Sequence, residues 1–173
     1  RNALVRKKDR VLSLAHLQNV AKRTLTRFAA LFGSAEKRHG RFGPPLQLIG
    51  KPLSGLEEER TSKRVERSKG VLAAKRLVFD AIERRATDIH LEPKDTEFTI
   101  RLRIDGVMYP TNSLDRSLGE SVCNIFKVLS AMDITQKRRA QDGSFRGRLS
   151  DRDIDIRVAT QGTQHGEKMS LRI

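Results

Sequence analysis

The sequence has no tryptophan, few aromatic residues of any kind and a single cysteine, Cys123. Aromatic residues make up 5% of the 173 residues, whereas proteins that stack the bases of single-stranded nucleic acid depend on aromatic side chains. A lone cysteine excludes an internal disulfide and a zinc site with several cysteine ligands. Cys123 falls within an apolar helical pattern, so we expect a small buried residue. This cysteine usage is typical of a reducing, cytoplasmic setting.

Long apolar runs and nucleotide-binding loops are also missing. The longest apolar run, FAALF at residues 28–32, is far shorter than the roughly 20 residues of a membrane-spanning helix. The P-loop spacing G-x-x-x-x-G-K-[ST] does not occur, because Gly50 and Lys51 are followed by Pro52, and Pro45 stands where the first glycine is needed. The four histidines are not spaced as metal ligands. We therefore expect that this chain alone does not hydrolyse ATP.

Basic residues are concentrated in the N-terminal part of the chain. The formal net charge is +14; residues 1–70 hold 17 Lys and Arg against 6 Asp and Glu, and residues 71–173 hold 18 against 15. This charge keeps one alternative open, a basic nucleic-acid-binding module. No nucleic-acid-reading motif accompanies it, so the charge alone predicts weak, sequence-independent binding that depends steeply on salt.

The first 39 residues are predicted to form a basic, helical extension. An apolar stripe over residues 9–32 predicts an amphipathic helix. Two interpretations remain open: a solvated helix that packs on a partner or on the main domain, or a helix attracted to an anionic membrane surface. The cations expected to contact such a membrane or partner are Lys7, Lys8, Arg10, Arg23 and Arg27.

The composition divides the chain into an extension at 1–39, a segment at 40–67 and a folded domain at 68–173. Residues 40–56 contain four glycines and three prolines and are predicted to be a linker. The charged residues that follow place acids before bases, as suits the dipole at the start of a helix. The sequence does not begin with methionine and has no signal-peptide pattern, so we expect a piece of a longer protein.

The folded domain is predicted to be α+β, a small antiparallel sheet with helices packed on one face. Apolar spacing predicts two helices, at residues 71–85 and 115–132. Asp105-Gly106 is a strong hairpin signal, because both central residues of such a turn need positive φ. The return strand is expected to end at Pro110. The predicted strands are 88–92, 97–104, one starting at 107, and three more at 145–150, 152–160 and 168–173.

Arginine is the distinctive residue of the folded domain. Strand alternation places Arg101 and Arg103 on one exposed face, and Arg116 opens the following helix. A guanidinium is planar, always charged and bidentate toward phosphate. Held on a rigid strand, such groups are suited to stabilising a phosphate supplied by another domain, as an arginine finger does. The alternative is a solvated, charged sheet face balanced by acids such as Glu97 and Asp105.

Five sequence blocks occur in one order over residues 70–173: ATDIHLEP, RLRIDGV, KRRAQDGSFRGRL, RDIDIRVAT and HGEKMSLRI. Together they resemble the N-terminal domain of the ATPases of type II secretion and type IV pilus assembly. That family typically reads A-S-D-I-H-x-E-P, R-x-R-x-D-G, K-R-x-P-Q-D-G-R, D-x-R-V-S-T, and G-E-K before a closing L-R. Residues 1–60 show no resemblance to a family.

The resemblance implies a PAS-like domain that precedes a RecA-like domain with the Walker motifs, where ATP and Mg bind. It implies a homo-hexameric parent protein, cytoplasmic and peripheral to the inner membrane. Such a parent uses ATP to drive pilin or pseudopilin assembly, or protein export, together with an inner-membrane platform protein. This chain would be the regulatory part without the motor, and the machine served (secretion, pilus extension or DNA uptake) stays open.

The resemblance also implies roles for three arginines. The first arginine of R-x-R-x-D-G falls on Arg101, and the family's second phosphate-reaching arginine falls on Arg116. Both would approach the γ-phosphate of ATP bound at the RecA-like domain. Arg103 shares the face of Arg101 but lies farther along the strand.

Three positions depart from the family pattern. Ala140 stands where proline is usual, Ser144 where arginine follows Q-D-G, and Gly162 where proline is usual. We therefore expect a looser loop at 136–146 and leave open whether Arg146 replaces the missing arginine. The HGEK stretch is interpreted as a turn into the last strand rather than as a site.

Overall fold

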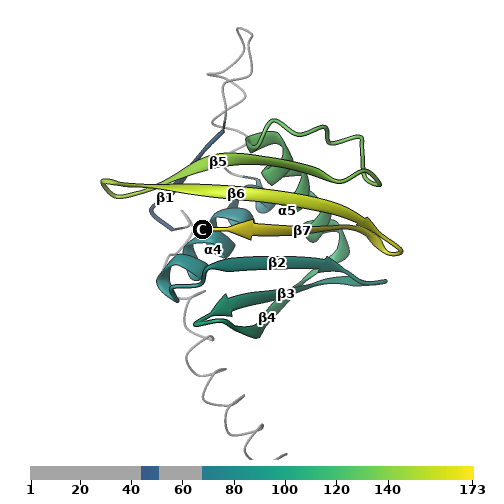
Figure 1. The fold of residues 1–173 in the computed structure, drawn as a ribbon, viewed down its shortest axis with the longest axis horizontal. Coiled ribbons are helices and arrows are strands. Elements are labelled where there is room, and N and C mark those ends of the chain that lie inside the picture. The colour runs from purple at the N-terminus through teal and green to yellow at the C-terminus, as the bar shows by residue number, and fades with distance from the viewer. Residues whose placement is uncertain (1–43, 51–67) are drawn as a thin grey trace, which may run out of the picture. The chain divides into compact units, whose positions relative to one another are not determined.

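The computed structural model describes residues 44–50 and 68–173, and it confirms the α+β class. The strands of this part form one antiparallel sheet in the order β1-β5-β6-β7-β2-β3-β4, and both helices pack on the same face (Figure 1). The strands are β1 Leu46–Ile49, β2 Asp88–Pro93, β3 Glu97–Ile104, β4 Val107–Asp115, β5 Gln141–Leu149, β6 Arg152–Thr163 and β7 Gly166–Arg172. Neither of the helices in the described residues lies on the opposite face, which is called the open face below. The predicted N-terminal extension and its five cations lie outside the described residues.

Helix α4, Lys69–Glu83, begins where Ser68 caps it. The Ser68 hydroxyl accepts a hydrogen bond from the Val71 amide at 3.2 Å, which satisfies one of the free N–H groups at a helix start. The apolar residues of the predicted stripe are buried toward the sheet. The helix ends before Arg85, whose positive φ of 54° takes the chain out of helical geometry.

Helix α5, Arg116–Leu129, is capped by Asp115, which accepts a hydrogen bond from the Leu118 amide at 2.8 Å. It packs against α4 at a close crossing, where a Cβ added to Gly70 would lie 2.9 Å from the Ile125 Cδ1 atom. Glycine is therefore used at position 70 for a close approach and does not interrupt the helix.

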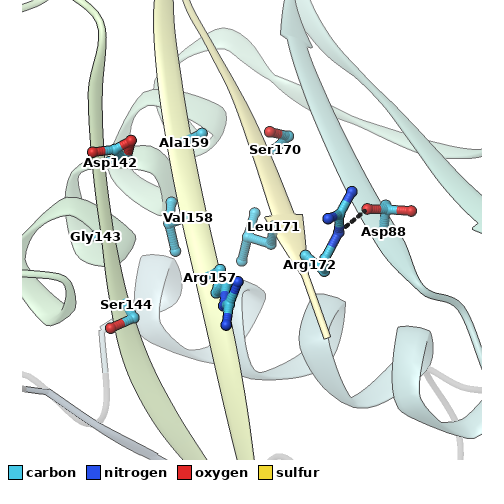
Figure 2. Close-up of a pocket in the computed structure, with 10 residues that line it drawn as sticks. All are labelled: Asp88, Asp142, Gly143, Ser144, Arg157, Val158, Ala159, Ser170, Leu171 and Arg172. Atoms are coloured by element: carbon cyan, nitrogen blue, oxygen red, sulfur yellow. Dashed lines mark hydrogen bonds and ion pairs between the residues drawn. The ribbon is translucent and has the colours of Figure 1, made fainter.

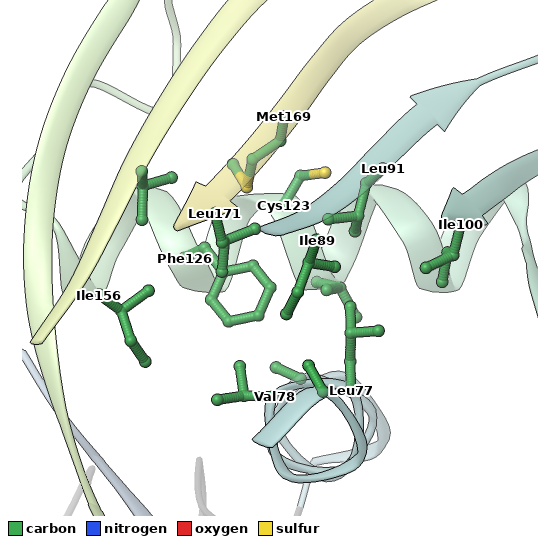
Figure 3. Packing of buried hydrophobic residues seen from close by; sticks show 14 of the residues in the cluster. Leu77, Val78, Ile89, Leu91, Ile100, Cys123, Phe126, Ile156, Met169 and Leu171 are labelled. Atoms are coloured by element: carbon green, nitrogen blue, oxygen red, sulfur yellow. The ribbon is translucent and has the colours of Figure 1, made fainter. Parts of the chain in front are cut away.

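The core lies between the helices and the sheet (Figure 3). Ile89 and Leu91 of β2 point into it, and Cys123 is buried there as predicted. The rings of Phe126 on α5 and Phe145 on β5 stack with centroids 5.7 Å apart. These apolar contacts from both halves of the sheet hold the open face in a fixed position relative to the helices.

Two strand predictions are wrong at the sheet edges. Leu46–Ile49, predicted to lie in a linker, form β1 and pair with β5. The return strand β4 does not end at Pro110 but continues to Asp115. Because β4 is an edge strand, a residue without an N–H is tolerated there at little cost. A third difference lies inside the sheet, where β5 begins at Gln141, earlier than the predicted start at residue 145 and inside the predicted 136–146 loop.

Candidate functional site

Arg101 and Arg103 lie on the open face of β3, as strand alternation predicted. Arg101 is opposite His90 of β2, and its Nη2 atom bonds the Glu92 carboxylate at 3.1 Å. The Arg101 side chain is 47% exposed. Its guanidinium therefore reaches toward the turn that joins β2 to β3 and remains accessible to a ligand.

Arg103 is bound more firmly than Arg101. It contacts the Asp88 carboxylate at 3.3 Å and donates to the Gly106 carbonyl at 3.1 Å. Asp88 also accepts hydrogen bonds from the Thr87 hydroxyl at 2.9 Å and from Arg172 at 3.2 Å. Burial alone would raise the pKa of Asp88, but these hydrogen bonds and the two arginine charges outweigh it and lower the pKa. A shared, ionised carboxylate thus holds Arg103 in place.

Arg116, the first residue of α5, lies on the helix side of the sheet. Its Nε atom bonds Glu120 at 2.8 Å, and its Nη1 atom donates to the Lys94 carbonyl. The guanidinium is 5.9 Å from the centroid of the Phe98 ring, a cation–π distance. Since Phe98 is buried against α5, Arg101 and Arg116 lie on opposite faces of the sheet.

The β2–β3 turn nevertheless links the two arginines. Glu92 contacts both Arg101 and the Lys94 ammonium, the latter at 3.5 Å, and Lys94 supplies the carbonyl that Arg116 contacts. Asp95 of the same turn pairs with His165 of the β6–β7 turn at 2.8 Å. The cationic groups thus gather at one end of the sheet. We call Lys94, Arg101 and Arg116 with their carboxylates the turn cluster.

The ion pairs of the turn cluster are exposed and therefore weak. The Arg116 side chain is 36% exposed and that of its partner Glu120 is 45% exposed. Pairs of this kind contribute about 0–1 kcal/mol to stability. A phosphate that brings its own charge and oxygen acceptors would compete effectively with Glu92 or Glu120 for a guanidinium.

The loop between α5 and β5 is anchored by side-chain hydrogen bonds, and that it is looser than the loop of its relatives stays a prediction. The Gln141 side chain donates to the Asp133 and Gln136 carbonyls, each at 3.0 Å, and accepts from the Asp133 amide at 2.9 Å. A Cβ at Gly162 would lie 2.8 Å from the Arg138 carbonyl oxygen. Glycine at 162 therefore lets the loop close on β6, where a larger residue would clash.

Sequence reasoning missed a buried ion pair behind this loop. The Lys127 ammonium bonds both Glu167 oxygens, at 2.9 and 3.0 Å, and the Gln136 carbonyl at 2.7 Å. Lys127 is fully buried. Two signals in the sequence could have revealed it: a lysine inside the apolar stripe of α5 and a glutamate in the HGEK stretch. The HGEK stretch itself leads into the last strand, β7, as predicted.

Arg146 is not part of the turn cluster. It lies on β5 opposite Asp155, and β6, β7 and β2 separate β5 from β3. Among the described residues no helix is long and apolar enough to cross a membrane. The same residues contain no group of three or more His, Cys, Asp or Glu side chains arranged to hold a metal ion.

Comparison with known proteins decides the family. The model of the family described as "Type II/IV secretion system protein" matches residues 65–173, which include both helices and every described strand except β1. The chain belongs to this family. The region that matches the family includes all five sequence blocks and the turn cluster.

Several curated members of the family are similar to the chain. The protein transport protein HofB homolog of Escherichia coli K12 is 41% identical over 98 residues, which is 57% of this chain and 21% of that protein. The type IV pilus assembly ATPase PilB of Thermus thermophilus is 32% identical over 117 residues, 68% of this chain and 13% of PilB. The type II secretion system ATPase E of Vibrio cholerae is 36% identical over 97 residues, 56% of this chain and 19% of that ATPase. The matched part thus spans about a fifth or less of these relatives.

Proposed function

We propose that this chain is the non-catalytic N-terminal domain of a longer secretion or pilus-assembly ATPase, called the parent protein below. The observation that carries the proposal is the turn cluster, in which Arg101 and Arg116 are held at one end of the sheet by exposed, exchangeable ion pairs. The family match and the small share of each relative that the chain covers support the same reading.

In this proposal the arginines act on a nucleotide held elsewhere. A downstream RecA-like domain binds Mg-ATP, and closure brings its γ-phosphate to the β2–β3 turn. Arg101 exchanges Glu92, and Arg116 exchanges Glu120, for phosphate oxygens, so that both stabilise charge in the transition state. Arg103 stays on Asp88 and supports the strand.

The same proposal gives the parent protein its wider setting. It is a cytoplasmic homo-hexamer peripheral to the inner membrane, where it contacts a platform protein of the secretion or pilus machine. Closure of each subunit around ATP couples hydrolysis to (pseudo)pilin assembly or protein export. The cations of the N-terminal extension are proposed to contact an anionic membrane surface or a partner, which cosedimentation with anionic liposomes, with and without residues 1–40, tests.

The test of the arginine role is steady-state ATP turnover by the parent protein with single substitutions. We expect Arg101→Ala and Arg116→Ala each to lower kcat by at least about a hundredfold, because each removes a charge that contacts the transferring phosphoryl group. Arg148→Ala is the matched control, since Arg148 is also an exposed strand arginine, paired with Asp153 at 2.7 Å. Unchanged turnover in both Arg101 and Arg116 variants would remove the proposed role.

A further inference from the structure

The open face is hollowed where small side chains meet on β6 and β7 (Figure 2). Ala159 is paired with Ser170 across these strands, and both line two adjoining depressions of about 530 and 360 Å³. These two short side chains leave a floor between longer neighbours. We call this place the Ala159–Ser170 hollow.

Two arginines stand at one end of the hollow. Arg157 and Arg172 are direct cross-strand partners, an arrangement of like charges that destabilises a sheet unless an anion is shared. Arg172 forms an ion pair with Asp88, but Asp88 is also paired with Arg103. In the described part of the chain Arg157 makes no ion pair. Arg103 and Arg172 therefore share the Asp88 carboxylate, and the charge of Arg157 borders the hollow beside them.

The other end of the hollow carries a histidine and a lysine. His90 is the cross-strand partner of Ser170 on β2, and Lys168 lines the same depression. The His90 Nε2 atom is buried, with no hydrogen-bond partner within the described residues. Burial lowers the pKa of His90. The nearby Arg103, Arg101 and Lys168 charges add to this effect, and the Asp88 charge opposes it. The lowered pKa favours the neutral form of the ring.

We propose that the Ala159–Ser170 hollow binds the phosphate group of a small phosphorylated ligand. Phosphate oxygens accept bidentate hydrogen bonds from a guanidinium. This suits Arg157, which has no ion-pair partner among the described residues, and Arg172 and the Ser170 hydroxyl can donate further bonds. Both depressions exceed the space of one oxyanion and fall within the size range of small-molecule sites.

The acids around the hollow restrict the ligand. Asp142 lines the larger depression together with Asp88, and a long polyanion such as nucleic acid would meet both carboxylates. A compact ligand avoids this repulsion, and hydroxyl groups on its body find an acceptor in Asp142. Arg101, assigned to ATP above, lines the smaller depression, but the proposed phosphate contacts are Arg157, Arg172 and Ser170, so substitutions at these three residues test this proposal separately.

The test is a titration of the 173-residue chain, followed by amide NMR shifts, at pH 7 and constant ionic strength. The probes are inorganic phosphate and adenosine monophosphate, with acetate as the carboxylate comparison. We expect saturable shifts centred on Ser144, Arg157 and Ser170. Arg157→Gln is expected to weaken phosphate binding at least about tenfold, since it removes a charge-assisted bond, whereas Arg148→Gln, on the same face, leaves it unchanged.

A second variant guards against a folding defect. Ser170→Val fills the hollow without changing charge, and it is expected to abolish binding while the melting temperature shows that the chain is folded. Tighter binding of adenosine monophosphate than of phosphate supports a ligand with a larger body, and equal binding supports free phosphate. Absence of saturation, equal binding of acetate, or full binding by Arg157→Gln would overturn the proposal.

Discussion

The buried pair of Lys127 and Glu167 shows how single residues support the loop between α5 and β5. The ammonium has three donors and contacts three acceptors, two of them on Glu167 and one on Gln136. A buried charge is tolerated only when it is paired and hydrogen-bonded in this way. The pair therefore ties α5 to β7 and, through Gln136, fixes the path of the loop.

Removing one partner of this pair should strongly destabilise the fold. We expect Lys127→Met to lower the free energy of unfolding by about 3–5 kcal/mol, because Glu167 would be left buried without its cation. The double variant Lys127→Met with Glu167→Met should lose much less. Urea unfolding of the two single variants and the double variant measures the coupling, and additive losses would show that the pair does not interact as described.

Cys123 should be chemically inert in the folded chain. Burial, to which the nearby Glu167 carboxylate adds, raises the pKa of Cys123 to about 12. At pH 8 only about one thiol in ten thousand would be ionised, and the thiolate is the reactive form. Reaction with a disulfide reagent should therefore be very slow in buffer and complete rapidly in denaturant. Rapid modification of the folded chain would contradict this burial.

At the scale of elements, two helix glycines set how closely the layers pack. A Cβ at Gly119 would lie 2.3 Å from Phe98 Cδ2, whereas a Cβ at Gly70 would lie 2.9 Å from the end of the Ile125 side chain. The first position thus fixes the distance from α5 to β3. The second position fixes the crossing of α4 and α5, but its neighbour there is the end of the Ile125 side chain, which can move.

Alanine at these two glycines should have unequal effects, although alanine favours helix by about 1 kcal/mol over glycine. We expect Gly119→Ala to destabilise by about 1–3 kcal/mol, because the Phe98 ring cannot move without disturbing the core. Gly70→Ala should cost less, since Ile125 can change rotamer. Thermal unfolding compares them, and a more stable Gly119→Ala variant would show that α5 and β3 are not packed this closely.

The type of an element, helix or strand, was predictable from sequence where the apolar periodicity extends over many residues and those residues are buried. Both helices and strands β2, β3 and β6 follow apolar spacing that their burial confirms. The edges were not predictable in the same way. A proline ends a strand in the interior of a sheet, but Pro110 lies on an edge strand and does not end it. Strand β1 forms only because β5 is there to pair with it. Such information belongs to strand order, which a local pattern does not contain.

At the scale of the whole molecule, the candidate site was predictable only in part. Alternation placed Arg101 and Arg103 on one face, and the structure confirms this. The position of Arg116 on the other face depends on how α5 packs over Phe98. The Ala159–Ser170 hollow depends on the pairing of β6 with β7. Both are tertiary relations between residues distant in sequence, so spacing along the chain did not reveal them.

The most direct measurement is a structure of the parent protein with Mg and a non-hydrolysable ATP analogue. The two arginines should leave Glu92 and Glu120, and Arg101 and Arg116 should each lie about 2.8 Å from a γ-phosphate oxygen. If both guanidiniums remain on their carboxylates in the closed, nucleotide-bound subunit, the turn cluster does not contact phosphate and the proposed function is contradicted.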